Sequence, residues 1–368
     1  MDSTRRRNAL GRLLAHENSA SDLLAFLFEV DPQPLLHLLN LDGGPYTCQR
    51  EAQASKGKGR LDLVLRRQAD GHPVALLELK GASDVHGDQL DRYNSWADNF
   101  EPSPRRFYCT LDGDDVIPPA PWQPLSLITV FGAWQTCGDA HAAWLAGEIT
   151  DLLRTWDLEA DGVIGHATGW YVTDLVSRRI ATTIDAELRR AHDDGSEARA
   201  YRTSGGNPMF VAWRRHPHGS EDAWIAVDVR CDGRGVPSRP WLVRPCVDVM
   251  STGQTGLLEA HDLAVALQPA MVLPAIRDAL TAQGRNRLAA ALYAEEHNGL
   301  SHPADPGVLA DWRARIVAGD QPGRRHPVFF HDRGLRLATQ LRVKTAELTR
   351  HDLAALTLSI LDHLVKHA

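Results

Sequence analysis

Three charged residues near position 70 have the types and the spacing of a metal-dependent hydrolytic site. Asp62 and Glu78 each lie eight positions from Asp70, and Lys80 follows Glu78 by two positions. Two neighbouring carboxylates can hold Mg²⁺ or Mn²⁺ and still leave positions for water and a phosphate oxygen. A lysine beside the cation can help to deprotonate the water or neutralise charge that develops on a phosphate. The pattern therefore indicates phosphoester chemistry, if the chain brings these side chains together.

A β-hairpin over residues 60–80 is the element that would bring them together. Two apolar runs with strand-like alternation flank an Asp-Gly turn signal at position 70, which is typical of a hairpin. A turn centred there places Asp62 opposite Glu78, and the period of two places Lys80 on the same face as Glu78. Like charges opposed across a ladder destabilise a sheet, so we expect a cation to compensate for the two acids.

An ordinary sheet with an ion pair between Glu78 and Lys80 is the alternative for the same residues. Two residues that stand two apart on one strand have poor geometry for mutual contact, so the sequence favours the metal site.

The pattern Asp62 … Glu78-Leu79-Lys80 resembles the signature of the PD-(D/E)XK nuclease superfamily, with Leu61 in place of the proline. Three further segments resemble parts of that superfamily in the expected order. They are a first helix that carries a glutamate (residues 12–19), a helix with the pattern Q-x-x-x-Y (residues 89–93) and the next core strand (residues 107–113). The resemblance spans residues 8–135 and is closest to bacterial proteins that join a nuclease core to a long C-terminal extension.

The resemblance implies a metal-dependent nuclease with a restriction-endonuclease-like fold. Asp62 and Glu78 would bind Mg²⁺ or Mn²⁺, the Leu79 carbonyl would be a third ligand, and Lys80 would position or activate the attacking water. The substrate it implies is DNA rather than RNA, and the setting is bacterial defence or DNA processing.

Glu17 is the next candidate, on a predicted helix over residues 5–28. It falls on the apolar stripe of that helix, where a charge is costly unless it is paired or liganded. The resemblance implies that it supports a second metal or a bridging water, whereas the residues alone favour a glutamate at the edge of the stripe that pairs with Arg12 or Arg50. We also expect the helix to break near residues 18–21, with Ser21 as the cap of a second segment.

A second amphipathic helix is predicted over residues 84–100. Gln89, Tyr93 and Trp96 share one face of it. The resemblance implies secondary roles for Gln89 and Tyr93 in the site, whereas Trp96 is interpreted as a core aromatic residue.

Two more features near the hairpin have two interpretations each. Glu51, in a predicted strand over residues 46–54, is either an extra ligand or a strand-edge glutamate, which is the commoner case. The basic segment 56–60 is either a loop that touches a nucleic-acid backbone or a solvated turn.

The pattern of strands and helices predicts that residues 1–157 form a first domain of the α/β class, with a mixed sheet flanked by helices. The segments behind this prediction are a helix at 32–40, strands at 105–112 and 125–134, a loop at 113–124 and a helix at 139–157.

Residues 158–368 are predicted to form an α+β, helix-rich domain that binds substrate or a partner, either a second copy or another protein. The segments expected here are a connector at 158–169, a helix at 171–192, strand-like runs within 199–250, and mainly helix over 257–300 and 305–366.

Composition limits the other classes of function. The 368 residues include 5 cysteines without a C-x-x-C pair, which disfavours a disulfide framework and a structural zinc site. An apolar run of membrane-spanning length and a signal-peptide core are both absent, so we expect a cytoplasmic protein without a membrane partner. The net charge of −7 counts modestly against nucleic-acid binding and keeps open a catalytically inactive nucleic-acid- or protein-binding module on the same fold.

Overall fold

The structure, a computed structural model, describes most of the 368 residues. The described ranges are 3–14, 16–42, 44–53, 59–80, 89–111, 118–166, 169–231, 240–250, 253–294, 305–320, 329–331, 335–338 and 340–368. The chain divides into two compact units, Met1–Leu158 and Glu159–Ala368. The sequence placed this boundary between residues 157 and 158.

The first unit contains a mixed five-stranded sheet in the order β1-β2-β3-β4-β5. Its strands are β1 (Tyr46–Gln53), β2 (Arg60–Arg67), β3 (Pro73–Leu79), β4 (Arg105–Thr110) and β5 (Gln123–Ser126). The first three strands are antiparallel neighbours, whereas β4 and β5 run parallel to β3. The expected mixed sheet is therefore present.

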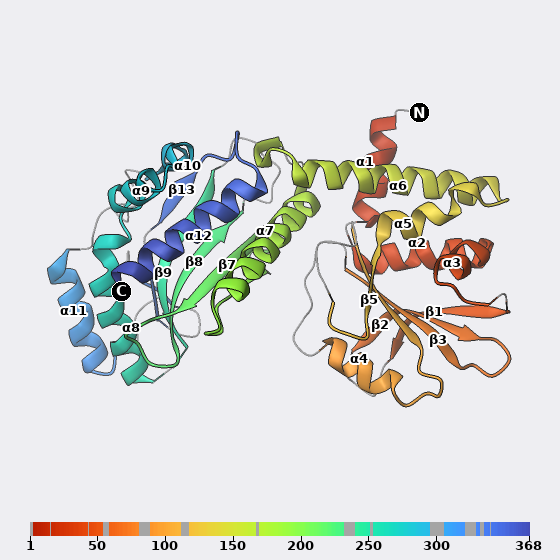
Figure 1. The fold of residues 1–368 in the computed structure, drawn as a ribbon, viewed down its shortest axis with the longest axis horizontal. Helices are drawn as coiled ribbons and strands as arrows, with labels where there is room; N and C mark the ends of the chain where they lie inside the picture. The colour runs from red at the N-terminus through yellow and green to blue at the C-terminus, as the bar shows by residue number, and fades with distance from the viewer. Residues whose placement is uncertain are drawn as a thin grey trace. The chain divides into compact units, whose positions relative to one another are not determined.

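Helices flank this sheet, as the sequence predicts. They are α1 (Ser3–Leu14), α2 (Glu17–Val30), α3 (Gln33–Leu38), α4 (Gln89–Ala97), α5 (Leu127–Gly132), the 3-10 turn η1 (Ala133–Thr136) and α6 (Ala140–Asp161). Figure 1 shows α4 on one side of the sheet and α2, α3 and α5 on the other.

Helix α4 is held to the sheet by an apolar cluster. Leu90, Tyr93 and Ala97 of the helix are buried against Leu76 of β3 and Tyr108 of β4. A fully buried side chain of this size stabilises the fold by about 1.5–3 kcal/mol. This packing fixes the face of α4 that carries Gln89 and Tyr93 over the end of β3.

The predicted strand at 125–134 is wrong over most of its length. Only Leu125 and Ser126 belong to β5, and the chain then forms α5 and η1. The Ser126 hydroxyl caps α5 by accepting a hydrogen bond from the Thr129 N–H at 3.4 Å. Leu127, Val130 and Phe131 are buried, which is helical spacing, so the periodicity outweighs the strand preference of the β-branched residues.

Two helix boundaries also differ from the expectation. The first break falls between Leu14 and Glu17, and Ser21 lies inside α2, where its hydroxyl donates to the Asn18 carbonyl rather than capping a helix. The predicted helix at 139–157 continues to Asp161 as α6, so the first part of the expected connector is helical.

The second unit contains an antiparallel eight-stranded sheet with the path β10-β13-β9-β8-β7-β6, and β12 joins β9 to β11. The strands are β6 (Glu197–Arg202), β7 (Pro208–Arg215), β8 (Ala223–Arg230), β9 (Trp241–Val249), β10 (Leu292–Tyr293), β11 (Phe329–His331), β12 (Leu335–Ala338) and β13 (Leu341–Val343). Thus the strand-like runs predicted within 199–250 are confirmed as β6–β9.

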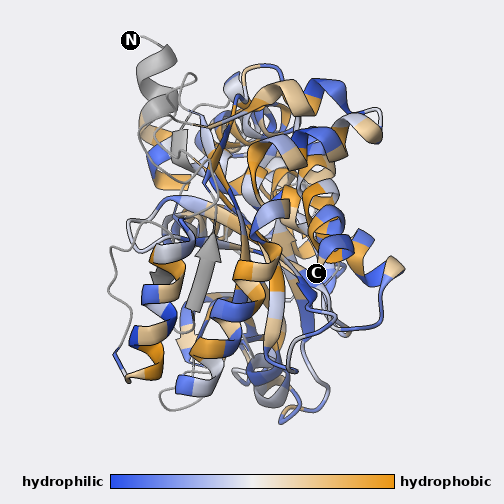
Figure 2. Ribbon diagram, turned by 90° about the vertical axis from the view of Figure 1, so that its left-hand side faces the viewer, coloured by the Kyte–Doolittle hydropathy of each residue, from blue (hydrophilic) through white to orange (hydrophobic). Residues whose placement is uncertain are grey.

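Helices of the second unit pack on this sheet and on one another. They are η2 (Ile164–His166), α7 (Gly169–Ala191), α8 (Gln254–Leu267), η3 (Gln268–Ala270), α9 (Leu273–Ala282), α10 (Asn286–Ala291), α11 (Pro306–Val317) and α12 (Arg350–His367). Figure 2 shows polar and apolar residues alternating along the helices, as expected where one side of a helix is buried.

Four short strands replace parts of the helix predicted at 257–300 and 305–366. In β13, buried Leu341 and Val343 flank half-buried Arg342, which is the alternation of a strand. The run of three residues is too short to be recognised in the sequence, because it is a strand only through its pairing with β9. Among the described helices, none is by itself long and apolar enough to cross a membrane, and one bent pair, Gln254–Ala270 with Leu273–Ala282, meets those criteria only when taken together.

Candidate active site

The hairpin formed by β2 and β3 brings Asp62 and Glu78 to neighbouring positions. Leu63 pairs with Leu77, so the next step of the antiparallel ladder carries Asp62 opposite Glu78. The Asp62 Oδ2 atom accepts a hydrogen bond from the Leu79 N–H at 2.7 Å. The two carboxylates therefore lie at the same end of the sheet, as the spacing around Asp70 predicts.

Glu78 is fully buried, and its carboxylate is held by two donors. The Oε1 atom accepts hydrogen bonds from Lys80 Nζ at 2.9 Å and from Gln89 Nε2 at 2.7 Å. Lys80 is itself only 3% exposed, and its backbone N–H donates to the Cys109 carbonyl at 2.7 Å. A charged pair this deeply buried requires close contact and additional hydrogen bonds, and both are present.

The expectation that Glu78 and Lys80 have poor geometry for mutual contact is wrong, and the ion pair of the alternative interpretation is present. Lys80 stands one position beyond the last residue of β3. Its four-carbon side chain is therefore not confined by the pleat of the sheet and reaches back to the carboxylate.

Gln89 links Glu78 to the helix α4. The Nε2 group of Gln89 donates to Glu78 and also to the Tyr93 hydroxyl, at 2.9 Å, one helical turn further along. The Tyr93 hydroxyl donates in turn to the Arg60 carbonyl at the start of β2. This chain of hydrogen bonds fixes the Glu78 carboxylate between the helix and the hairpin.

Two neighbouring side chains experience the charges of both carboxylates. Burial is the largest cause of the raised pKa of Tyr93, followed by the charge of Glu78 and, more weakly, that of Asp62. The pKa of the Cys109 thiol is also raised, first by burial and then by the negative charges of Asp62 and Glu78. Tyr93 and Cys109 therefore lie near both carboxylates, at the start of β2 and the ends of β3 and β4.

The remaining predicted site residues are placed as follows. Leu79 is the last residue of β3 and is buried beside Asp62. The side chain of Glu17, like the basic segment 56–58, lies outside the described residues. Glu51 forms an ion pair with Arg60 at 2.8 Å, as expected for a strand-edge glutamate rather than a ligand.

Cys109 is a neighbour that sequence reasoning did not associate with the site. It lies beside Leu79 because β4 runs parallel to β3. A parallel partner is reached through a long connection that includes α4, so no short turn fixes its register and no local sequence signal identifies it.

The donor atoms at this site fit a small divalent cation. Mg²⁺ is commonly bound through one or two carboxylates and retains several waters, and Asp62 and Glu78 supply two. Within the described part of the chain, no group of three or more His, Cys, Asp or Glu side chains is placed to hold a metal ion. Any cation here would therefore depend on water and backbone oxygen as well.

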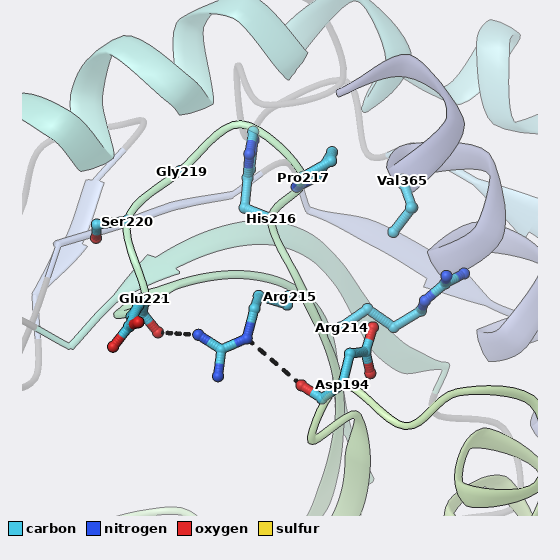
Figure 3. Close-up of a pocket in the computed structure, with 9 residues that line it drawn as sticks. All are labelled: Asp194, Arg214, Arg215, His216, Pro217, Gly219, Ser220, Glu221 and Val365. Atoms are coloured by element: carbon cyan, nitrogen blue, oxygen red, sulfur yellow. Dashed lines mark hydrogen bonds between the residues drawn. The ribbon is translucent and has the colours of Figure 1, made fainter.

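A separate pocket of about 390 Å³ lies in the second unit, at the turn between β7 and β8 (Figure 3). The Arg215 guanidinium donates to the carbonyls of Glu221 and Asp194, and Arg214 pairs with Asp362 at 2.8 Å. The end of β3, rather than this pocket, is the candidate active site, because it joins two carboxylates and an ammonium whose types suit metal-dependent chemistry.

Replacement of Tyr93 by phenylalanine tests the hydrogen-bonded chain. The variant loses the bonds to Gln89 and Arg60 and retains the ring, so we expect destabilisation by about 1–2 kcal/mol, measured by urea denaturation. Trp96→Phe is the control, because the Trp96 ring packs on Phe100 at the edge of the apolar cluster. Equal loss of stability in the two variants would contradict a specific role for the hydroxyl.

No protein-family model, curated protein or solved structure matches this chain.

Proposed function

We propose that the first unit is a metal-dependent nuclease of the PD-(D/E)XK type that hydrolyses phosphodiester bonds of DNA. The observation that supports this most is the convergence of Asp62, Glu78 and Lys80 at the end of β3, with Gln89 and Tyr93 behind them. Burial of an acid and a base together is costly for a fold, which favours a functional reason for the pair.

The order of elements supports the same proposal. A helix, an antiparallel hairpin with the acidic residues, a helix with the pattern Q-x-x-x-Y and a parallel strand follow one another as α2, β2–β3, α4 and β4. This is the order that the resemblance to the superfamily implies, and a restriction-endonuclease-like core is the finer fold that we propose for this sheet.

In the proposed site, Asp62, Glu78 and the Leu79 carbonyl would hold Mg²⁺ or Mn²⁺. A cation of this kind polarises a phosphoryl oxygen and lowers the pKa of bound water. Lys80, beside Glu78, orients the attacking water and neutralises charge on the phosphate. Gln89 holds the Glu78 carboxylate in place, and Tyr93 holds Gln89.

One observation favours a second candidate, a catalytically inactive binding module. The Glu78 carboxylate accepts hydrogen bonds from Lys80 and Gln89, so the Lys80 ammonium already compensates the charge of this carboxylate. The two candidates differ in one property, because only the nuclease is stabilised by a divalent cation at this site.

The test combines cleavage with cation binding. Purified protein is incubated with supercoiled plasmid, linear duplex, single-stranded DNA and RNA, each with Mg²⁺, Mn²⁺ or EDTA. We expect DNA cleavage with either cation, none in EDTA, and recovery when Mg²⁺ is restored. Mn²⁺ at 100 times its Kd should also raise the free energy of unfolding by about 2.7 kcal/mol. Cleavage that persists in EDTA, or a thermal midpoint insensitive to Mn²⁺, would contradict the proposal.

A further inference from the structure

One face of the sheet in the second unit points away from the helices α7 and α12. Arg214 of β7 pairs with Asp362 of α12, and Arg202 of β6 pairs with Asp174 of α7, so even-numbered residues of β6 and β7 face these helices. Side chains alternate along a strand, so odd-numbered residues of β6 and β7 face the opposite way. Odd-numbered residues of β7 pair with even-numbered residues of β8, which pair with even-numbered residues of β9. The even-numbered residues of β8 and β9 therefore lie on this same opposite face.

Aromatic rings gather on this opposite face. Tyr201 of β6 is 44% exposed, and Trp213 of β7 and Trp224 of β8 are half-buried. The rings of Tyr201 and Trp213 meet edge to face, with centroids 5.9 Å apart. The outer face of an antiparallel sheet usually carries polar side chains, so one exposed ring beside two partly exposed rings indicates a binding surface.

Guanidinium groups share this face with the rings. Arg215 stacks over the Trp224 ring at 4.7 Å, and the Arg199 side chain is 56% exposed. Of the described charged side chains that the register places on this face, Arg199, Arg215, Arg230, Arg342 and Glu197 are at least partly exposed, whereas Arg244, Asp228 and Asp248 are buried. The charged side chains that reach solvent on this face are therefore mainly positive, in a chain whose net charge is −7.

Rings and guanidiniums on one sheet face suit one class of partner. Bases stack on aromatic side chains, and arginines pair with the phosphates between them. Tyr201, Trp213 and Trp224 stand on three neighbouring strands, and neighbouring strands are about 4.8 Å apart, so an unpaired strand that crosses the sheet can stack its bases on them. A duplex offers no free base faces, which restricts the partner to a single strand.

We propose that the aromatic face, defined as Tyr201, Trp213 and Trp224 with Arg199, Arg215 and Arg230, binds single-stranded nucleic acid. This goes beyond cleavage by the first unit, and it assigns the second unit a surface that holds an unpaired strand. The proposal is independent of metal binding at Asp62 and Glu78.

The test measures binding of the full chain to a fluorescein-labelled oligothymidylate of about 20 nucleotides, in EDTA so that no cleavage occurs. We expect Tyr201→Ala and Trp213→Ala each to weaken binding by at least about 5-fold, whereas Trp213→Phe retains most of it. A blunt duplex of equal length should bind at least about 10-fold more weakly than the single strand. Arg199→Ala should reduce the slope of log K against log salt by about 0.7.

Two variants serve as matched controls. Trp144→Ala removes an exposed ring from α6, and Arg189→Ala removes an exposed guanidinium from α7. Neither should change the affinity. Circular dichroism of every variant checks that the fold is intact, and Tyr201→Ala, at an exposed position, keeps the test valid if Trp213→Ala unfolds.

Three results would overturn the proposal. They are no binding of the oligothymidylate by the wild-type chain, equal affinity for strand and duplex, and equal affinity of Tyr201→Ala, Trp213→Ala and the controls. Self-association that Tyr201→Ala abolishes, without oligonucleotide binding, would instead identify the aromatic face as an interface between copies of the chain.

Discussion

Replacement of Asp62 by asparagine is expected to lower metal-dependent DNA cleavage by at least about 10³-fold, because a cation site contributes several kcal/mol to stabilisation of the transition state. Asparagine keeps the size of the side chain and an oxygen that can accept the Leu79 N–H, so the hairpin should stay intact. The change removes only the negative charge that would hold the cation. Initial rates of plasmid nicking in Mg²⁺ provide the measurement.

Substitution of Asp62 separates lost activity from lost stability better than substitution of Glu78 does. Removal of the Glu78 charge would leave the buried Lys80 ammonium without the carboxylate it contacts at 2.9 Å, so lost activity would be mixed with lost stability. Asp62 is only partly buried and makes its described hydrogen bond to a backbone N–H.

Glu51→Gln is the matched control for Asp62→Asn. Glu51 lies on the adjacent strand β1, carries the same charge, and makes a partly exposed ion pair with Arg60. Such a pair contributes at most about 1 kcal/mol to stability, and the cleavage rate should stay within about twofold of wild type. A variant Asp62→Asn that cleaves at the wild-type rate, or a Glu51→Gln variant that does not cleave, would show that the acidic site has been assigned to the wrong residues.

The placement of Asp62 opposite Glu78 was predictable because a short hairpin fixes its own register. The turn near Asp70 and the alternation of the two apolar runs leave few possible registers for the two strands. A turn centred on Asp70 pairs Leu63 with Leu77, and the structure contains this pair. The face of α4 was predictable for a similar reason, since Gln89 and Tyr93 are one helical turn apart.

Other features of the site depend on contacts that are distant in the sequence. The position of Cys109 follows from parallel pairing across a long connection. The ion pair of Glu78 with Lys80 depends on where β3 ends, and strand ends are set by tertiary packing rather than by local pattern. The second sheet illustrates the same limit, because the short strands β11–β13 exist only through their pairing with one another and with β9.

Replacement of Arg244 by methionine is expected to destabilise the second unit by about 3–5 kcal/mol. Arg244 pairs with Asp228 on the adjacent strand, and the two side chains are 2% and 0% exposed. Methionine fills much of the volume and leaves the carboxylate in the interior with its weaker contact to Arg230, at 3.6 Å. Urea denaturation followed by far-ultraviolet circular dichroism measures the loss.

The double variant Asp228→Leu with Arg244→Met separates the charge from the packing. If the cost of Arg244→Met comes from a buried carboxylate that has lost its partner, then removal of that carboxylate should recover most of the stability, since buried ion pairs can be replaced by apolar side chains at little cost. Arg189→Met, which breaks an exposed pair with Asp185, should cost less than about 1 kcal/mol. A double variant as unstable as Arg244→Met alone would instead show that the guanidinium matters for its packing. The charge pair would then be incidental to the stability of the second sheet.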